Sequence, residues 1–293
     1  MSDHAVVLGG GGSVGNAWEI GVAAGLFVAG LDVTEADLII GTSAGSTAAA
    51  QISSASATQL FAAVVTPAPQ APAGQAGSDP GSAPRAPVSD HQERTNRIIA
   101  ISGDAADMRR RIGAAALQLD PTPDGSRQTR WRATVAARLP SQSWPLQRML
   151  VTAVDARTGD PVVFDRDSGV DLVDAVAASS SSGAPYGIGD NCYIDGGYRR
   201  NENADLATGC GWVLVFSPFG GRSRHPLEWG MHLTAQVDEL RTSGSRVETV
   251  FPDGPSLDAF GANMMDLSRR PGAARAGWHQ GIALARELTK FWA

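Results

Sequence analysis

The chain has 293 residues, of which 43% are hydrophobic and 18% charged, and its formal net charge is −6. This length can bury the core of one large domain, and the mild negative charge disfavours nonspecific nucleic-acid binding. No apolar run is long enough to span a membrane, and residues 1–4 lack the basic start of a secretory signal. We therefore expect a cytoplasmic protein, with export by a signal-independent route left open. Cys192 and Cys210 form neither a disulfide framework nor a metal-type spacing, so free thiols and no metal or cofactor are expected.

The first predicted elements are an apolar strand at residues 4–8, a run of glycines, and a helix at residues 16–29. The loop reads Gly9-Gly10-Gly11-Gly12-Ser13-Val14-Gly15, and four consecutive glycines are costly in unfolded-chain entropy unless the backbone itself has a role. One interpretation is the G-x-G-x-x-G fingerprint of a dinucleotide site, with a ribose-binding acid at Asp32, Glu35 or Asp37. The other is an oxyanion hole made by backbone N–H groups of the loop.

The sequence Gly41-Thr42-Ser43-Ala44-Gly45 follows the apolar run 38–40 and matches G-x-S-x-G, the nucleophile elbow. A strand that turns sharply into a helix strains the backbone at the serine and leaves no room for flanking side chains, hence the two glycines. The serine hydroxyl would then lie at the N-terminus of a helix predicted for residues 46–59. Because a dinucleotide-binding second strand should end in an acid, this elbow favours the oxyanion interpretation of the first loop.

A serine nucleophile needs a base, and a histidine late in the chain is the usual one. His225 and His279 are late enough, but neither follows a strand, and surface or capping positions describe them more simply. Asp195 is the stronger candidate because it ends a short strand, 192–195, and precedes Gly196 and Gly197, which let other backbone approach its carboxylate. Asp155 is the rival acid, although the residues after it are typical of a hairpin turn.

These three motifs together resemble the patatin-like phospholipase family. The resemblance rests on the glycine loop after the first strand, the serine elbow after the second, and Asp195-Gly196-Gly197 late in the chain; residues 148–164 and 170–185 add a similar hairpin and a similar helix before the acid. The chain departs from the family at Val14, where Arg or Lys is usual, and in the serine-rich run 178–185.

The resemblance implies an α/β fold with a central, mostly parallel sheet between helices, and a Ser-Asp dyad without a metal. By position, Ser43 is the nucleophile and Asp195 its base. The oxyanion hole falls on Gly10, Gly11 and Gly12, of which Gly11 and Gly12 would supply the N–H groups. The glycines expected to shape the elbow and loops are Gly15, Gly41, Gly45, Gly196 and Gly197.

The rest of the chain is predicted to belong to the same single domain, 1–293. Residues 66–90 form a Pro/Ala/Gly-rich tract that offers little to bury and is expected to be flexible.

Residues 91–140 are expected to form a helical lobe, a candidate lid, with amphipathic helices at 94–119 and 131–139 and a loop at 120–128. Residues 93–138 contain nine arginines and five acids, which gives a net charge of +4. A basic lobe of this kind could cover the active site or contact anionic lipid headgroups. The simpler interpretation is a solvated face with Arg109-Arg110-Arg111 in water. The 260–292 stretch predicts helical packing against the sheet.

The predicted function is hydrolysis of lipid acyl esters through an acyl-serine intermediate. The expected partners are a lipid or acyl ester substrate and peripheral membrane contact, and not nucleic acid. Two alternatives remain at this stage. One is a small-substrate carboxylesterase or thioesterase that uses the same dyad, and the other is a nucleotide- or acyl-binding module in which Ser43 has no catalytic role.

Overall fold

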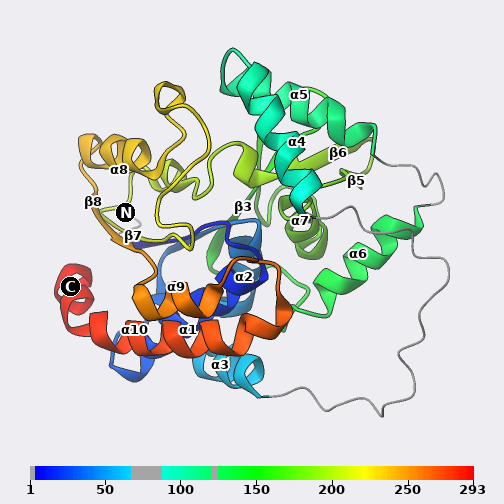
Figure 1. Ribbon diagram of the computed structural model, residues 1–293. Coiled ribbons are helices and arrows are strands. Elements are labelled where there is room, and N and C mark those ends of the chain that lie inside the picture. Colours follow the sequence, from blue (N-terminus) through cyan, green and yellow to red (C-terminus); the bar gives the residue numbers. More distant parts are fainter. Residues whose placement is uncertain (1–3, 67–87, 120–124) are drawn as a thin grey trace, which may run out of the picture.

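The computed structural model describes residues 4–66, 88–119 and 125–293. Within these residues the chain forms one mixed sheet of eight strands with helices packed against it (Figure 1). The strands are β1 (His4–Leu8), β2 (Leu38–Thr42), β3 (Arg148–Asp155), β4 (Pro161–Phe164), β5 (Tyr186–Ile188), β6 (Asn191–Asp195), β7 (Trp212–Phe216) and β8 (Arg246–Val250). The helices are α1 (Gly12–Val28), α2 (Ala44–Ile52), α3 (Ala57–Val65), α4 (Val88–Ile101), α5 (Ala105–Leu117), α6 (Ser126–Ala136), α7 (Leu172–Ser179), α8 (Leu233–Thr242), α9 (Gly254–Phe260) and α10 (Arg270–Trp292).

The strand order is β5-β6-β3-β2-β1-β7-β8, with β4 also paired to β3. The central strands β3, β2, β1, β7 and β8 are parallel, whereas β4, β5 and β6 run antiparallel to their neighbours. Since β1 and β2 are parallel neighbours, their carboxyl ends meet at the same edge of the sheet. That edge is where ligands bind in open α/β sheets. The predicted α/β class, with a mostly parallel sheet, is confirmed.

Alternate residues of the central strands face two separate apolar cores. On β1, Val6 and Leu8 join the core beneath α1, α7 and α10, while Ala5 and Val7 join the core beneath α8. Both faces of these strands are therefore buried. That burial explains why their sequences are continuous apolar runs with no polar alternation.

Helices α1 and α10 lie side by side along one face of the sheet, although they come from opposite ends of the chain (Figure 1). Glycines make this close approach possible. A Cβ on Gly21 would lie 2.1 Å from the carbonyl oxygen of Ala274, and one on Gly277 would lie 2.4 Å from that of Trp18. The small residues thus let two backbones touch, and they fix where the first turn of α10 lies relative to α1.

Several predicted helices differ from those observed. The helix predicted at residues 46–59 is two helices, α2 and α3, because Ser56 caps a new helix start with a reciprocal hydrogen-bond pair to Gln59. The span 94–119 is likewise divided into α4 and α5, since Asp104 accepts from the N–H of Asp107 and caps the second helix. The first helix begins at Gly12, earlier than predicted. Residues 126–128, expected in a loop, belong to α6.

The 91–140 segment separates into two parts. Helices α4 and α5 contact each other, and α5 contacts β6, whereas α6 contacts α7. The triplet Arg109-Arg110-Arg111 is not uniformly solvated, because Arg109 donates to the carbonyl of Gly159 at 2.8 Å and Arg111 pairs with Asp107 at 2.8 Å. Most of the Pro/Ala/Gly-rich tract, residues 67–87, lies outside the described residues. Its flexibility and the role of 91–140 as a lid stay predictions.

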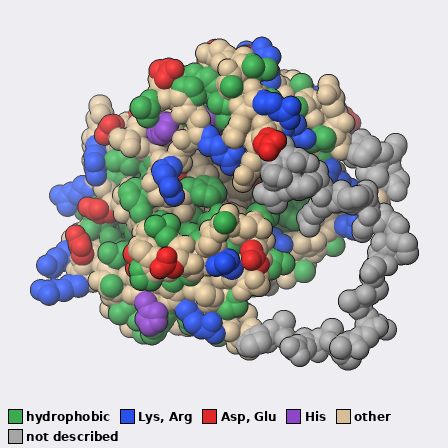
Figure 2. Space-filling view, in the orientation of Figure 1, with side chains coloured by type: hydrophobic (Ala, Val, Ile, Leu, Met, Phe, Trp, Pro, Cys, Tyr) green, Lys and Arg blue, Asp and Glu red, His purple; other side chains and the backbone are tan. Residues whose placement is uncertain are grey.

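Figure 2 shows that this face of the molecule is hollowed near its centre, between the groups of helices drawn above and below in Figure 1. Hydrophobic side chains and arginine or lysine side chains occur together at the rim of this hollow.

Candidate active site

Ser43 occupies the sharp turn between β2 and α2. Its backbone has φ 54° and ψ −117°, a conformation that costs free energy for any residue with a Cβ. The flanking glycines have a steric cause. A Cβ on Gly41 would lie 2.5 Å from the Cα of Ser46, and one on Gly45 would lie 2.0 Å from the carbonyl oxygen of Leu8. The turn therefore sits against the end of β1 and leaves the Ser43 side chain partly exposed.

The hydroxyl of Ser43 donates a hydrogen bond of 2.7 Å to Oδ2 of Asp195. The other carboxylate oxygen, Oδ1, accepts from the N–H of Gly197 at 2.8 Å. Asp195 is buried, and the loss of hydration raises the pKa of its carboxyl to about 6, against the lowering effects of the bonds from Ser43 and Gly197. A carboxylate so placed is a stronger base than an exposed aspartate and is still ionised at neutral pH.

The glycine loop lies against Ser43. A Cβ on Gly10 would lie 3.6 Å from the Cβ of Ser43. The N–H of Gly10 donates to the carbonyl of Asn201 at 3.0 Å, so Gly10 shapes the loop and its N–H is not available to an oxyanion. Among the described residues, the N–H groups of Gly11 and Gly12 have no hydrogen-bond acceptor. Val14 is fully buried in the apolar core.

Three polar residues that sequence reasoning missed hold these segments together. Ser179, at the end of α7, accepts the backbone N–H of Ser43 at 2.9 Å. Asn201 donates from its side chain to the carbonyl of Gly10 at 3.2 Å, in addition to its backbone contact. Asn203 is fully buried with φ 56°, and its amide donates to the hydroxyls of Thr42 and Thr152 at 2.9 and 3.2 Å. For Asn201 and Asn203 the only sequence signal was the polar run after Asp195, and for Ser179 it was the serine-rich run 178–185.

The rival bases have other partners. Oδ1 of Asp155 accepts from the N–H groups of Arg157 and Thr158 at 2.7 and 3.0 Å and so closes the β3–β4 hairpin turn. His225 bonds the hydroxyl of Ser223 at 2.6 Å, and the ring of His279 packs against Trp278.

Two of the three acids considered for a dinucleotide site, Asp32 and Asp37, also have structural partners. Asp32 caps a short 3-10 helix, Val33–Glu35, and Asp37 accepts from the N–H of His4 at 3.0 Å.

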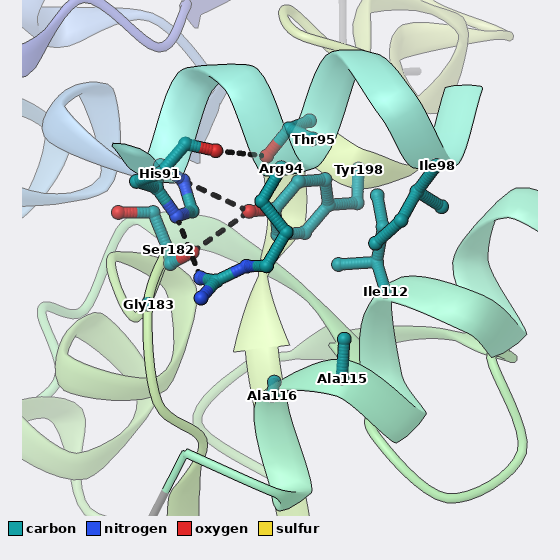
Figure 3. Close-up of a pocket in the computed structure, with 10 residues that line it drawn as sticks. All are labelled: His91, Arg94, Thr95, Ile98, Ile112, Ala115, Ala116, Ser182, Gly183 and Tyr198. Atoms are coloured by element: carbon teal, nitrogen blue, oxygen red, sulfur yellow. Dashed lines mark hydrogen bonds between the residues drawn. The ribbon is translucent and has the colours of Figure 1, made fainter. Parts of the chain in front are cut away.

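A small cavity of about 10 Å³ is lined by residues of α4 and α5 and by Ser182, Gly183 and Tyr198 (Figure 3). The hydroxyl of Tyr198 donates to the carbonyl of Ser182 at 2.8 Å within it, and His91 and Arg94 approach from α4. Because the N–H of Asp195 donates to the carbonyl of the adjacent Ser181 at 3.1 Å, this cluster braces the strand that carries the acid. The space suffices for about one water and not for a substrate.

Comparison with known proteins gives a family for this arrangement. The model of the family described as patatin-like phospholipase matches residues 6–208, which include the glycine loop, the elbow and the acid. The chain belongs to the patatin-like phospholipase family. Among solved structures it is similar to VipD from Legionella pneumophila, with 11% sequence identity, a TM-score of 0.43, and coverage of 98% of this chain and 67% of that chain. No curated protein matches the chain.

Membership of this family supports action on lipid substrates as an acyl hydrolase. The part of the chain that the structure describes contains no group of three or more His, Cys, Asp or Glu side chains arranged to hold a metal ion. Nor does any helix in it combine the length and apolar character that crossing a membrane requires.

Proposed function

We propose that this protein hydrolyses acyl esters of lipids, with Ser43 as nucleophile, Asp195 as the base, and the N–H groups of Gly11 and Gly12 as the oxyanion hole. The observation that carries this proposal is the 2.7 Å hydrogen bond from the Ser43 hydroxyl to a buried carboxylate, at a strained and partly exposed turn. A serine in such a bond can transfer its proton as it attacks a carbonyl carbon.

In the acylation step, Ser43 Oγ forms a bond to the ester carbonyl carbon while its proton moves to Oδ2 of Asp195. The carbonyl electron pair moves onto oxygen, and the resulting oxyanion accepts hydrogen bonds from the N–H groups of Gly11 and Gly12, which have no other acceptor among the described residues. The tetrahedral adduct then collapses, the bond to the leaving alcohol breaks, and Asp195 returns the proton to that alcohol.

In the deacylation step, a water gives its proton to Asp195 as its oxygen attacks the acyl carbon of Ser43. The second tetrahedral adduct releases the carboxylic acid and restores the serine hydroxyl. One carboxylate serves both steps because burial raises the pKa of Asp195 to about 6, which lets it accept and release a proton near neutral pH.

Replacing the nucleophile tests the proposal. Ser43→Ala should abolish labelling by a fluorophosphonate probe and lower ester turnover by roughly 10³-fold or more, since no other group can form the acyl intermediate. The measurements are labelling of the purified protein and rates on p-nitrophenyl esters and phospholipid vesicles. Ser54→Ala is the matched control, because that exposed hydroxyl bonds only backbone carbonyls near the end of α2. Undiminished turnover by a folded Ser43→Ala protein would overturn the proposal.

The same substrate panel separates the remaining alternatives. Turnover of short soluble esters or thioesters without turnover of phospholipids would indicate a small-substrate esterase. An unlabelled Ser43 with no turnover of any ester would favour a non-catalytic binding module.

A further inference from the structure

Arg270 is the first residue of α10, and it reaches the first turn of α1, directly after the glycine loop. Its Nη1 donates to the carbonyl of Ser13 at 2.7 Å and to Oδ1 of Asn16 at 3.0 Å. The two partners flank Val14, whose own N–H donates to the carbonyl of Met264 at 3.0 Å. The segment 264–270 therefore holds the loop that carries Gly11 and Gly12 from the outside. This segment lies beyond the residues that the family model matches.

The contact continues from the loop to the nucleophile turn. Asn16 is buried and donates from Nδ2 to Oε1 of Gln51 at 3.0 Å, and at 3.5 Å to the carbonyl of Ala44, the residue after Ser43. Gln51 in turn donates to the carbonyl of Arg138 at 2.9 Å. Through Asn16, a single guanidinium thus connects the start of α1 with the start of α2, the two helices whose first turns border the predicted oxyanion position.

The positive charge of Arg270 lies at the end of a helix where a negative charge is usually favoured. A cation at a helix N-terminus opposes the helix dipole, and Arg270 lies at the N-terminal turns of both α1 and α10. Neither helix has an acidic residue in its first turn, and no carboxylate within the described part of the chain pairs with Arg270. An uncompensated positive charge beside the loop is unfavourable at rest, and it becomes favourable when an oxyanion forms at Gly11 and Gly12.

The location of Arg270 is fixed by backbone packing. Gly21 and Gly25 of α1 meet the carbonyls of Ala274 and Trp278 of α10 so closely that a Cβ on either glycine would lie 2.1 Å from the oxygen. Helix α10 therefore cannot slide along α1 without a clash, and its first residue has one position relative to the loop. Such a rigid placement is what a charge needs in order to act in the transition state without reorganising.

We propose that Arg270 is a positioning residue for the hydrolysis reaction, which holds the glycine loop against the nucleophile turn and supplies positive potential to the oxyanion. This inference rests on the proposed function. It assigns a part in the reaction to the C-terminal helix. Arg270 does not touch the substrate in this assignment; it acts through the loop N–H groups and through Asn16.

The test compares Arg270→Gln and Arg270→Lys with the parent protein, all three as full-length chains. Arg270→Gln should lower kcat on a small neutral p-nitrophenyl ester by roughly 10- to 100-fold with KM changed by less than about threefold, because the charge acts only when the oxyanion exists. Arg270→Lys keeps the charge and should recover much of kcat. If Arg270→Gln does not fold, Arg270→Lys is compared with the parent: it keeps the charge but replaces the guanidinium whose Nη1 makes both bonds, so we expect a fall in kcat smaller than tenfold without a matching change in KM.

A second measurement separates a structural from a catalytic effect. An alkyl trifluoromethyl ketone adds to the Ser43 hydroxyl and gives a tetrahedral alkoxide, with the serine proton moved to Asp195, whereas the matching methyl ketone binds without forming much of this adduct. The inhibition constant of the fluorinated ketone should rise about as much as kcat falls, and that of the methyl ketone should stay nearly constant. Equal changes for both ketones would overturn the assignment.

Arg275→Gln is the matched control. Arg275 lies on the same helix and donates to a backbone carbonyl, that of Val65, at 3.2 Å, away from the loop. A fall in kcat for Arg270→Gln no larger than that for Arg275→Gln would overturn the inference and leave the proposed function intact. A parent protein that hydrolyses no ester and takes up no fluorophosphonate would instead show that the proposed function itself is wrong.

Discussion

At the scale of single residues, the proposed site depends on the carboxyl group of Asp195, which is buried away from water. Burial raises the pKa of Asp195 to about 6, although Ser43 and Gly197 both donate hydrogen bonds that favour its ionised form. Desolvation therefore outweighs the two bonds. The result is a base that is stronger than an ordinary aspartate, at the cost of an ionised group in the interior.

This cost predicts a pH-dependent gain in stability for Asp195→Asn. The pKa of about 6 in the folded protein is above that of an aspartate in an unfolded chain, so the folded state binds more protons between these two pKa values. The free energy of unfolding therefore falls as pH rises through that window. Because an asparagine side chain cannot ionise, at pH 7 to 8 the variant should be more stable than the parent by ~1–3 kcal/mol. Urea unfolding at pH 8 and pH 4 measures this.

The gain should be much smaller at pH 4, where the parent carboxyl is mostly protonated. Asp155→Asn is the control, because that side chain closes an exposed hairpin turn by accepting two backbone N–H bonds. Equal stability of Asp195→Asn and the parent at pH 8, with unchanged dependence on pH, would show that Asp195 carries no desolvation cost.

At the scale of elements, the close contact of α1 and α10 determines more than packing. The nearest neighbours of these glycines are backbone atoms of the partner helix and not flexible side chains. A methyl group on any of them would therefore clash unless the two helices moved apart. The same contact fixes the first turn of α10, from which Arg270 reaches the loop beside Ser43. The packing of α1 against α10, far from Ser43 and Asp195, therefore influences the position of the glycine loop beside Ser43.

Gly21→Ala tests the contact. Its Cβ would lie 2.1 Å from the carbonyl oxygen of Ala274, so the helices must separate, and we expect a loss of ~2–4 kcal/mol in the free energy of unfolding. Chemical denaturation checks this. Gly272→Ala in the first turn of α10 is the control, because the nearest atom to its Cβ is 4.0 Å away and alanine favours the helix, so stability should be unchanged or slightly higher. A Gly21→Ala protein as stable as Gly272→Ala would mean that the helices separate without cost.

At the scale of the whole molecule, the span that matches the family model is only part of the folding unit. It ends at residue 208, whereas β7 pairs with the whole of β1, and α10 covers α1. Both elements come after the matched span. They contact the strand and the helix on either side of the glycine loop.

A chain ended after residue 208 should therefore fail to fold. It would leave β1 as an unpaired edge and expose the apolar face of α1, and exposed strands of this kind aggregate. We expect no cooperative unfolding transition and no ester turnover from this fragment, measured by circular dichroism and p-nitrophenyl ester assay beside the full chain. Co-expression with residues 209–293 serves as the control and should recover part of the soluble protein. A monomeric, cooperatively folded fragment would contradict the expectation.

The sequence alone determined the features that depend on local sterics. The glycines at 41 and 45 predicted a sharp turn because a Cβ there has no room, and the apolar runs before Ser43 and Asp195 predicted the strands that end at them. The α/β class followed from the alternation of such strands with helices. The exact ends of the helices could not be predicted in the same way, because the break between α2 and α3 depends on a capping pair at Ser56 and Gln59.

Only the tertiary structure decided which distant segments meet. The hydrogen bond between Ser43 and Asp195 joins residues 152 positions apart. Local patterns marked each residue as a candidate and the family resemblance paired them, but only the fold brings the two side chains into contact. The parts played by Ser179, Asn201 and Asn203 had no comparable signal, because serine and asparagine are common in loops and their contacts depend on the packing of other elements. Arg270 is the extreme case: nothing near it in the sequence indicates a site, and it reaches the glycine loop only because two helices from opposite ends of the chain pack backbone to backbone.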